Sequence, residues 1–392
     1  MRIVIDGRGA IRYRGTGIGT YTHQLAENVA LTASACDTVV ICLPQGAPPL
    51  PLEESLATGS AVEPRARVRC VRLSATERAA ETAELADLCV RERADILHLP
   101  QNGRGLPDVP CAVVTTVHDL IPFTLPQTCS ASYLRDSIRD MPWAMHRSDR
   151  IIAVSRSTAV DLREVLGIAA EKIAVVHEAP EEQYLAEISE DGVRKVTSKY
   201  GLTPGYILHV GGFNPRKNLA LLLDAAARLL QDRSAAQALP QVVLSGAPGR
   251  DSSRLAQMIS DCRLQGRVVM PGLVPVSDMP GLYGAAGLVC CPSLSEGFSL
   301  PLVEAMACGV PLVVSDIPAH REVAGDAALF FDPCDPAMMA SKLALALSEP
   351  ERRRALAASG RVRVRGYSWR RAAVETWLVY RWAVDQRGHL SA

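Results

Sequence analysis

The feature that most constrains the fold is an alternation of short β-branched runs with longer helical patterns, which begins at residue 2 and restarts near residue 206. In the first half it predicts strands at Arg2–Ile5, Thr38–Leu43, Val68–Leu73, Ile96–Leu99, Ala112–Val117, Ile151–Val154 and Ile173–Val176. The helices predicted between them are Ile18–Ala33, Thr76–Arg93, Ser130–Arg147 and Ser157–Leu166. Apolar runs without polar alternation are typical of strands buried on both faces, so the pattern indicates a doubly wound parallel sheet.

The same pattern predicts a second domain. A polar stretch, Glu178–Val196, is interpreted as a linker, after which strands are predicted at Tyr206–Val210, Val242–Leu244, Val268–Met270, Gly287–Cys291, Leu312–Val314 and Leu329–Phe331. A length of 392 residues suits two domains of ordinary size. We predict two Rossmann-like domains, 1–185 and 186–371, and a terminal helix within 372–392 that can pack back on the first domain. A cleft is expected between the domains, with ligands beyond the carboxyl ends of the strands.

The composition excludes several classes of protein. Hydrophobic residues make up 48% and charged residues 21%, which is typical of a globular chain. The formal net charge is zero, which gives no reason to expect a nucleic-acid partner. The eleven cysteines form no Cys-x-x-Cys pair and are expected to be reduced thiols. Neither a signal peptide nor a spanning helix is predicted, so we expect a cytoplasmic protein with at most a peripheral contact at the inner face of the membrane.

One candidate site follows the strand that ends at Cys291. A Pro-Ser turn leads through Glu296 into a helix, and the unpaired N–H groups at a helix start attract anions such as phosphate. Glu304 lies inside that helix among apolar residues, where an unpaired carboxylate would be costly. The alternatives are that Glu296 only caps the helix and that Glu304 is solvated. We favour a role for Glu304 in accepting hydrogen bonds from a ligand such as a ribose diol.

A second candidate site follows the strand Tyr206–Val210. Gly211 and Gly212 permit a close approach of the backbone to a ligand, and Arg216 and Lys217 come just before the next helix. Arg binds phosphate oxygens through its planar fork and Lys acts as a point charge. The alternative is ordinary surface charge, but the position at a strand's carboxyl end favours a phosphate site.

Two weaker features lie in the first half. The glycine-rich loop Arg14–Tyr21 precedes a helix but lies too far from the first strand for the tight turn of an NAD site. His118 follows the buried strand Ala112–Val117 and should face the expected cleft. A lone histidine is more often structural than catalytic, although this position favours a ligand contact.

Taken together, these segments resemble glycosyltransferase family 4, whose members have the GT-B fold. The resemblance rests on the Glu-x7-Glu segment from Glu296 to Glu304, on the Gly-Gly-x-x-x-Arg-Lys-Asn segment, and on the tail Tyr367–Trp369. The segment Thr-Val-His-Asp-Leu-Ile-Pro around His118 is similar to bacterial mannosyl- and rhamnosyltransferases of surface polysaccharide synthesis.

The resemblance implies a role for each candidate residue. Glu304 would hold the donor ribose, and Glu296 would contact the sugar near its reacting carbon. Arg216 and Lys217 would neutralise the diphosphate leaving group, and His118 would contact the transferred sugar. Further donor-binding positions are Gly17, Gly212, the backbone N–H groups of Phe298, Ser299 and Leu300, and Val274 beside the base. Thr16 stands where many members have a glycine, so the geometry of the loop before Gly17 is open.

The implied activity is transfer of a hexose, with retention, from a nucleotide diphosphate-sugar to a glycan or lipid-linked glycan. The His118 segment favours GDP-mannose as donor. No Asp-x-Asp pattern is present, and two cations with a helix start can relieve the leaving-group charge, so no metal and no further cofactor are expected.

Three alternatives remain open from the sequence. A GT-B sugar-nucleotide 2-epimerase would use the same diphosphate site without an acceptor. A non-catalytic nucleotide-sugar or glycan-binding protein would keep the same residues but turn nothing over. An NAD-dependent dehydrogenase is disfavoured because its glycine fingerprint, tight against a strand and followed by an acidic residue about 20 positions later, does not occur.

Overall fold

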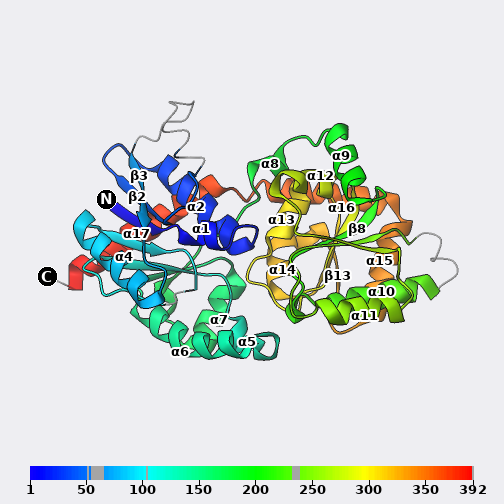
Figure 1. The fold of residues 1–392 in the computed structure, drawn as a ribbon, viewed down its shortest axis with the longest axis horizontal. Helices are drawn as coiled ribbons and strands as arrows, with labels where there is room; N and C mark the ends of the chain where they lie inside the picture. The colour runs from blue at the N-terminus through cyan, green and yellow to red at the C-terminus, as the bar shows by residue number, and fades with distance from the viewer. Residues whose placement is uncertain (51–52, 54–65, 103–104, 232–238, 391–392) are drawn as a thin grey trace. The chain divides into compact units, whose positions relative to one another are not determined.

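The chain divides into two compact units of alternating strands and helices. The structure is a computed structural model that describes residues 1–50, 53, 66–102, 105–231 and 239–390 (Figure 1). Unit 1 comprises Met1–Glu178 and Ser368–Ala392, and unit 2 comprises Ala179–Tyr367. The chain thus passes between the units at residues 178–179 and 367–368. The boundaries expected from the sequence were after residues 185 and 371.

Unit 1 is built on a parallel sheet, which has seven strands among the described residues. The strands are β1 (Arg2–Asp6), β2 (Thr38–Pro44), β3 (Arg67–Leu73), β4 (Ile96–Leu99), β5 (Ala112–Val117), β6 (Arg150–Ala153) and β7 (Ile173–Val175). Their order is β3-β2-β1-β4-β5-β6-β7. The strand order reverses between β1 and β4, which is the point where such sheets bind ligands.

Helices cover both faces of this sheet. They are α1 (Arg8–Arg12), α2 (Gly17–Thr32), α4 (Arg78–Glu92), α5 (Ile121–Thr124), α6 (Ala131–Arg147), α7 (Arg156–Leu166) and α17 (Trp369–Leu390). Leu85 of α4, Met145 of α6 and Leu162 of α7 join the core on one face. On the other face α17 packs against α2 and β5, and the indole Nε1 of Trp377 donates to Val29 O at 3.2 Å. The last helix therefore completes unit 1.

Unit 2 repeats the design with a six-stranded parallel sheet within its described residues. The strands are β8 (Tyr206–Val210), β9 (Val242–Ser245), β10 (Val268–Gly272), β11 (Ala286–Cys291), β12 (Leu312–Ser315) and β13 (Ala328–Phe331), in the order β10-β9-β8-β11-β12-β13. Here the order reverses between β8 and β11. The predicted doubly wound parallel architecture is confirmed in both units.

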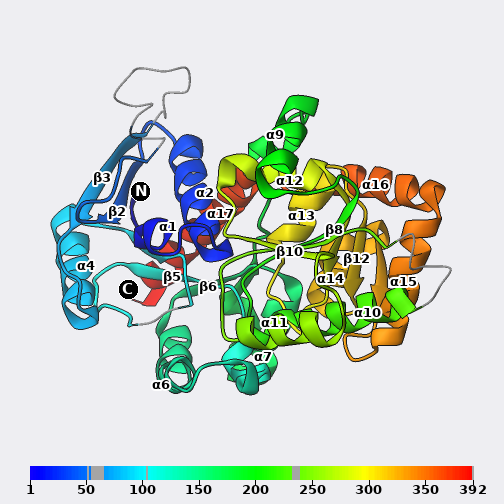
Figure 2. The same cartoon turned by 45° about the vertical axis from the view of Figure 1, so that its right-hand side comes forward.

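The helices of unit 2 also form two layers. They are α8 (Glu182–Leu185), α9 (Glu190–Tyr200), α10 (Leu219–Gln231), α11 (Ser252–Asp261), α12 (Met279–Gly284), α13 (Leu300–Ala307), α14 (Pro318–Ala324), α15 (Pro336–Ser348) and α16 (Pro350–Val364). Figures 1 and 2 show α10, α11 and α15 on one face of the sheet, with α12, α13 and α16 on the other. The apolar sides of α10 and α15 bury Leu222, Leu223 and Leu343 against the strands.

The prediction of a linker over Glu178–Val196 is wrong, because α8 and most of α9 lie in this stretch. Most of its polar residues face solvent, whereas Tyr184 and Val196 are buried against the rest of unit 2. Ser189 caps α9, with its hydroxyl accepting from Gly192 N at 3.1 Å. The composition of an exposed helix face had hidden these two short helices.

Candidate active site

The residues singled out in the second half of the sequence meet at the carboxyl ends of β8 and β11. These two strands are neighbours, and the strand order reverses between them. The segment after β8 contains a short 3₁₀ turn, Pro215–Lys217, and the segment after β11 leads into α13. Leu294 N donates to Arg216 O at 2.9 Å and joins the two segments. This is the position at which open parallel sheets bind ligands.

Arg216, Lys217 and Glu296 form one cluster of charged groups in unit 2. Lys217 Nζ donates to Glu296 Oε1 at 2.6 Å, and Arg216 Nη1 donates to Glu296 Oε2 and, at 2.8 Å, to Ser295 O. Ser293 Oγ adds a bond to Glu296 Oε1 at 2.7 Å. These bonds join two segments of the chain, one with Arg216 and Lys217 and the other with Ser293 and Glu296, which are about 80 residues apart in sequence. The charged groups are therefore held in a defined geometry.

The electrostatics of this cluster favour an anion. Burial would raise the pKa of Glu296, but the charges of Arg216 and Lys217 and the hydrogen bonds from Lys217 and Ser293 hold that pKa well below its ordinary value. Glu296 is therefore ionised at neutral pH. Two cations meet one carboxylate, and both remain partly accessible, with side-chain exposures of 18% for Arg216 and 12% for Lys217. The three side chains carry one formal positive charge, which suits a phosphate group.

Two glycines keep the backbone beside this cluster open. A Cβ on Gly211, whose φ is +152°, would lie 3.1 Å from Lys217 Cε and 3.2 Å from His209 Nε2. A Cβ on Gly246 would lie only 2.0 Å from Gly211 O, so the loop after β9 packs directly on the loop after β8. At Gly212, the predicted ligand contact, the nearest atom to a Cβ would be Ala247 O at 3.7 Å. Gly211 is thus more tightly constrained than Gly212.

The start of α13 has an unusual backbone. Ser299 precedes the helix with φ +83° and ψ +75°, a left-handed conformation that is uncommon for a residue with a side chain. Within the described chain its hydroxyl makes no capping bond to the first turn. Phe298 and Leu300 are buried on either side of it, and Phe298 packs edge-on against Tyr367 at 5.6 Å. Strained backbone at a helix start is a frequent feature of anion sites.

Glu304 is buried in α13, as the apolar sequence around it predicted. The hydroxyl of Tyr283, from α12, donates to Glu304 Oε2 at 2.6 Å. Burial, followed by the charge of Glu304, raises the pKa of Tyr283 well above its ordinary value, so this donor keeps its proton. Tyr184 of α8 packs edge-on against Tyr283 at 5.7 Å. The carboxylate is thus supported by aromatic side chains from two other helices.

Val274 lies just beyond the end of β10 and is buried. The preceding Gly272 has φ +76°, and its carbonyl accepts from Gly246 N at 2.9 Å. The loop of Val274 is therefore tied to the loop after β9, which packs on Gly211.

The site residue predicted in unit 1, His118, is buried at the end of β5 with both ring nitrogens engaged. Nδ1 lies 3.2 Å from Glu178 Oε1 and Nε2 lies 3.1 Å from Pro100 O. Burial lowers the pKa of His118, but the hydrogen bonds to Glu178 and the Pro100 carbonyl and the charge of Glu178 raise it by more. The pKa of His118 therefore lies above its ordinary value. Both neighbours are acceptors, which favours the imidazolium form. A sugar hydroxyl could bind a ring nitrogen only if one of these bonds opened.

Gly17 is the first residue of α2 and is exposed. Thr16, which stands in place of a glycine common in similar proteins, caps the helix by accepting from Gly19 N at 3.4 Å. The close approach is made by Gly19, where a Cβ would lie 2.1 Å from Tyr13 O. Thr16 is therefore compatible with a regular start of α2.

Several residues that support these groups were missed by the sequence reasoning. Ser293 was passed over although it lies in the Pro-Ser turn beside Glu296, and that proximity was an available signal. Tyr283 and Glu178 come from other parts of the fold, and single polar residues in such contexts give no pattern. Asn102 was also missed, although its side chain accepts from His118 N at 2.7 Å and donates to Asp119 O at 3.1 Å.

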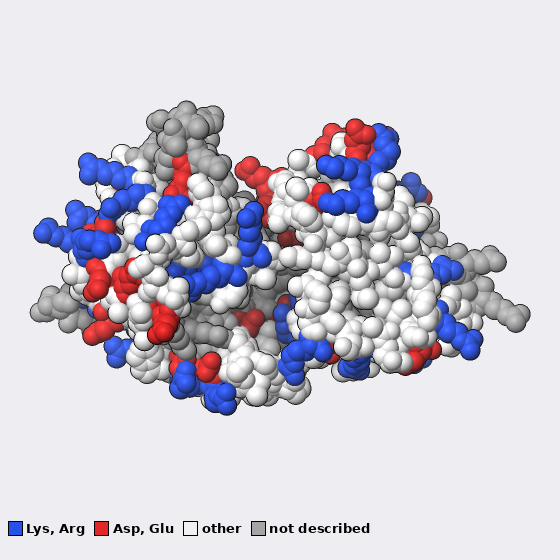
Figure 3. Space-filling model, in the orientation of Figure 1, with Lys and Arg blue, Asp and Glu red and all other residues white. Residues whose placement is uncertain are grey.

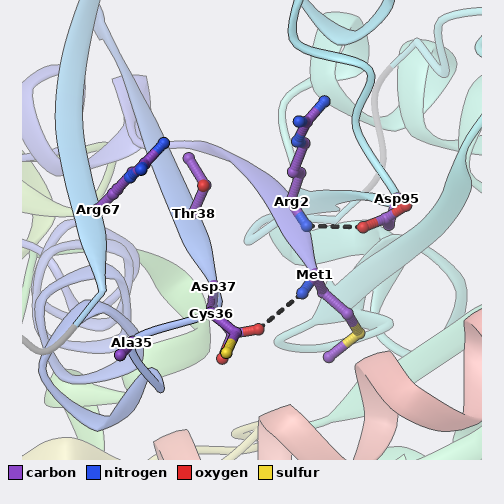
Figure 4. Close-up of a pocket in the computed structure, with 8 residues that line it drawn as sticks. All are labelled: Met1, Arg2, Ala35, Cys36, Asp37, Thr38, Arg67 and Asp95. Atoms are coloured by element: carbon purple, nitrogen blue, oxygen red, sulfur yellow. Dashed lines mark hydrogen bonds and ion pairs between the residues drawn. The ribbon is translucent and has the colours of Figure 1, made fainter.

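Other surface features lie away from these residues. A hollow of about 390 Å³ opens at the amino-terminal ends of β1 and β2. Figure 4 shows the amino group of Met1 paired with Asp37, and the backbone N–H of Arg2 donating to Asp95. Basic and acidic side chains are interspersed on the face shown in Figure 3. Among the described residues, no helix is long and apolar enough to cross a bilayer, and no cluster of three or more His, Cys, Asp or Glu side chains could hold a metal ion.

Two family descriptions match the chain, one in each half. Residues 15–179 match Glycosyltransferase Family 4, and residues 195–363 match Glycosyl transferases group 1. The first match includes Gly17 and His118. The second includes the cation cluster, Val274 and α13.

Curated relatives include bacterial mannosyltransferases and D-inositol 3-phosphate glycosyltransferases. The O-antigen chain mannosyltransferase B of Escherichia coli is 32% identical over 273 residues, which cover 68% of this chain and 70% of that protein. The serotype-specific mannosyltransferase WbdA of Escherichia coli is 27% identical over 269 residues. That match covers 68% of this chain but only 33% of the longer relative.

Solved structures share the fold over nearly the whole chain. The sucrose-phosphate synthase of Thermosynechococcus elongatus superposes with a TM-score of 0.74 at 18% identity, covering 97% of this chain and 98% of that one. The Anabaena protein HepE in complex with UDP-glucose gives 0.64 at 17% identity and covers 99% of both chains. With its two parallel sheets and these matches, the chain has the GT-B fold and belongs to glycosyltransferase family 4, as a glycosyltransferase related to bacterial O-antigen mannosyltransferases.

Proposed function

We propose that this enzyme transfers a hexose, with retention, from a nucleotide diphosphate-sugar to a hydroxyl of a growing or lipid-linked glycan. GDP-mannose is the favoured donor. The observation that carries the proposal is the cluster of Arg216, Lys217 and Glu296 at the point where the strand order of unit 2 reverses.

The cations of this cluster would receive the diphosphate. Arg216 and Lys217 are held in place by contacts within the protein, to Glu296 and Ser295. Little reorganisation is therefore needed when negative charge develops. A diphosphate would share them with Glu296 or replace it as their partner. The start of α13, with the N–H groups of Phe298, Ser299 and Leu300, would bind phosphate or sugar oxygens.

The rest of the donor would extend from this point along unit 2. Glu304 would accept hydrogen bonds from the ribose hydroxyls, with Tyr283 holding its other side. Gly212 would let the backbone approach the diphosphate, and Val274 would border the base. The buried position of Glu304 favours this role, because a ligand diol supplies the donors that a buried carboxylate needs.

The chemical step follows from this placement. The acceptor oxygen forms a bond to the anomeric carbon while the bond from that carbon to the diphosphate oxygen breaks. The acceptor proton passes to the departing phosphate oxygen on the same face, which retains the configuration. Arg216 and Lys217 stabilise the charge on the leaving group, so we expect no metal requirement. On the side of unit 1, His118 would lie near the transferred sugar and Gly17 near the diphosphate.

The donor is the least constrained part of this proposal. The Escherichia coli relatives named above are mannosyltransferases, which supports a mannosyl donor. HepE, which has the same fold at 17% identity, was solved in complex with UDP-glucose. Uridine nucleotides are therefore included among the donors to be tested.

A thermal-shift panel of GDP, UDP, ADP and dTDP, with and without their sugars, tests the proposal. Stabilisation that is largest with GDP and GDP-mannose is expected, because a ligand that binds only the folded state raises the unfolding temperature. A larger shift with a uridine nucleotide would replace GDP-mannose as the donor. No shift with any nucleotide, in folded protein, would contradict the nucleotide-sugar site.

Product analysis then separates the remaining activities. Incubation of the selected donor with a mannosylated glycan acceptor should yield an elongated glycan, in the presence of EDTA as well as without it. An altered sugar nucleotide formed from donor alone would indicate an epimerase instead. Binding without any product would indicate a non-catalytic protein.

A further inference from the structure

A buried histidine beside the cation cluster has no assigned role. His209 lies at the fourth position of β8 and is 1% exposed. Its Nδ1 lies 3.1 Å from Cys290 O on the neighbouring strand β11. A carbonyl oxygen can only accept a hydrogen bond, so Nδ1 is the donor and carries the proton. Within the described residues, the other ring nitrogen, Nε2, is buried and has no hydrogen-bond partner.

The protonation state of this ring is set by its surroundings. Burial, followed by the charge of Lys217, lowers the pKa of His209 to about 4. At neutral pH the ring is therefore neutral, with its single proton on Nδ1. Nε2 is then an acceptor without a hydrogen, and a buried acceptor that lacks a partner is destabilising. A hydrogen-bond donor close to His209 Nε2 would therefore stabilise the site.

The donor within reach is the ammonium of Lys217. A Cβ placed on Gly211 would lie 3.2 Å from His209 Nε2, 3.1 Å from Lys217 Cε and 3.5 Å from Lys217 Nζ. The two nitrogens therefore border one small space that the absence of a side chain on Gly211 leaves open. Lys217 Nζ carries three hydrogens, and its bond to Glu296 Oε1 at 2.6 Å uses one of them.

We propose that His209 is a positioning residue for Lys217, with Nε2 accepting a hydrogen bond from Nζ through one water molecule in the space beside Gly211. The proposal deepens the diphosphate site and rests on the role proposed there for Lys217. A lysine side chain is flexible and acts as a point charge, so its direction depends on fixed acceptors around it. Glu296 and His209 supply two such acceptors, and a third hydrogen of Nζ is left to point at a phosphate oxygen.

Two substitutions separate the acceptor from the structural bond. In His209→Asn, the carboxamide nitrogen can occupy the place of Nδ1 and keep the bond to Cys290 O, but nothing reaches the place of Nε2. In His209→Gln, the longer side chain can place its oxygen where Nε2 lies. We expect His209→Asn to lower kcat/KM about tenfold, the worth of one hydrogen bond to a charged group, and His209→Gln to recover most of it. Unfolding temperatures of both variants report whether the fold is kept.

A double-mutant cycle with Lys217→Ala tests whether His209 acts through Lys217. The loss caused by His209→Asn should shrink to less than about twofold in the Lys217→Ala background. Where turnover of that background is too low to measure, the cycle is run on the affinity for GDP, measured by calorimetry. An equal loss in both backgrounds, or wild-type activity of His209→Asn alone, would overturn the positioning role while leaving the diphosphate site intact. Wild-type turnover and GDP affinity of Lys217→Ala would instead refute the diphosphate site, and the inference with it.

Discussion

At the carboxyl edge of the sheet in unit 1, His118 lies between Glu178 and Pro100 O, and Arg8 forms a buried two-pronged ion pair with Asp6 at 2.7 and 2.8 Å. At the same edge of unit 2, Arg216 and Lys217 meet the single carboxylate of Glu296. Arg8 Nη1 also lies 3.7 Å from Glu81, which pairs with Arg12. The cations at this edge, Arg8, Arg12 and protonated His118, are thus balanced by Asp6, Glu81 and Glu178, whereas the cluster of unit 2 leaves one positive charge over.

This difference indicates distinct tasks for the two edges. A buried ion pair that is balanced and hydrogen-bonded has no need of a further charged partner and fixes the local structure. A cluster with excess positive charge attracts an anion and can stabilise charge that develops during a reaction. The difference supports our proposal that the diphosphate binds unit 2, and we expect substitutions at the two edges to have different consequences.

The largest effect is expected for Lys217→Ala. Removing one preorganised donor from a site of developing negative charge should lower kcat by about 10²–10³. The unfolding temperature should also fall, because the buried carboxylate of Glu296 loses one of its two cations. The turnover is therefore measured at a temperature at which the variant is shown to be folded. Lys195→Ala, an exposed lysine on α9, is the matched control and should keep wild-type turnover. A turnover above one tenth of wild type in Lys217→Ala would place the leaving group elsewhere.

The next effect concerns the balanced edge of unit 1. His118→Ala should destabilise the protein by about 1–3 kcal/mol, because the buried Glu178 and Pro100 O lose their donors. The raised pKa of His118 adds a pH dependence: its contribution is complete below the unfolded value of about 6.5 and is lost as pH rises through the folded value. Denaturant titrations from about pH 5 to about pH 9 should show the gap from wild type closing with rising pH.

The same substitution also probes catalysis. His118→Ala should impair sugar transfer more than GDP binding, since the proposed diphosphate site lies in unit 2. His146→Ala, an exposed histidine on α6, serves as the control for both measurements. A gap in stability that widens with pH, or equal losses of transfer and nucleotide binding, would count against the assigned role.

The balance at Glu296 should have the opposite pH dependence. The depressed pKa of Glu296 means that its contribution to stability is present above the unfolded value of about 4.3 and is lost as pH falls toward the folded value. Glu296→Gln should therefore be less stable than wild type at pH 7, by roughly 1–3 kcal/mol, and the gap should narrow in acid. Calorimetric unfolding at about pH 7 and about pH 2.5 measures this, with the exposed Glu351→Gln as control. A gap that is constant with pH would show that the ion pair is not the cause.

The smallest effect is expected for Tyr283→Phe. Loss of the hydroxyl bond to Glu304 should weaken GDP binding about five- to tenfold, with a smaller loss for 2′-deoxy-GDP if Glu304 accepts from the ribose. Tyr184→Phe is the matched control, since no hydrogen bond from its hydroxyl occurs among the described residues. Equal weakening of both nucleotides by Tyr283→Phe would remove Glu304 from the ribose.

The sequence predicted the strands well because buried parallel strands are continuous apolar runs. The strands Ile96–Leu99 and Ala112–Val117 were predicted with the bounds that the structure shows. The helices α8 and α9 were not predicted because they lack such a continuous apolar pattern. Only a few residues of these helices, such as Tyr184 and Val196, are buried, and the charged residues around them conceal that pattern.

Some site residues could likewise be predicted from a local pattern, and others could not. Arg216, Lys217 and Glu296 were found because each lies in the segment that links the end of a strand to the next helix, and parallel strands bring their carboxyl ends to one edge. The bonds of His118 to Glu178 and of Glu304 to Tyr283 depend on packing between distant segments, which no local pattern encodes. His209 was concealed for a further reason, since a polar residue inside a buried strand gives no signal of its unpaired nitrogen.

We propose above all that the excess positive charge of the cluster formed by Arg216, Lys217 and Glu296 binds the diphosphate of the donor. Isothermal calorimetry of GDP binding to wild type and to the Arg216→Ala/Lys217→Ala double variant tests it most directly, with an unfolding scan of the variant to verify its fold. We expect measurable binding to wild type and a loss of at least about 100-fold in the variant, in line with two charge-assisted contacts. Equal affinity of the two proteins would contradict a diphosphate site at Arg216 and Lys217.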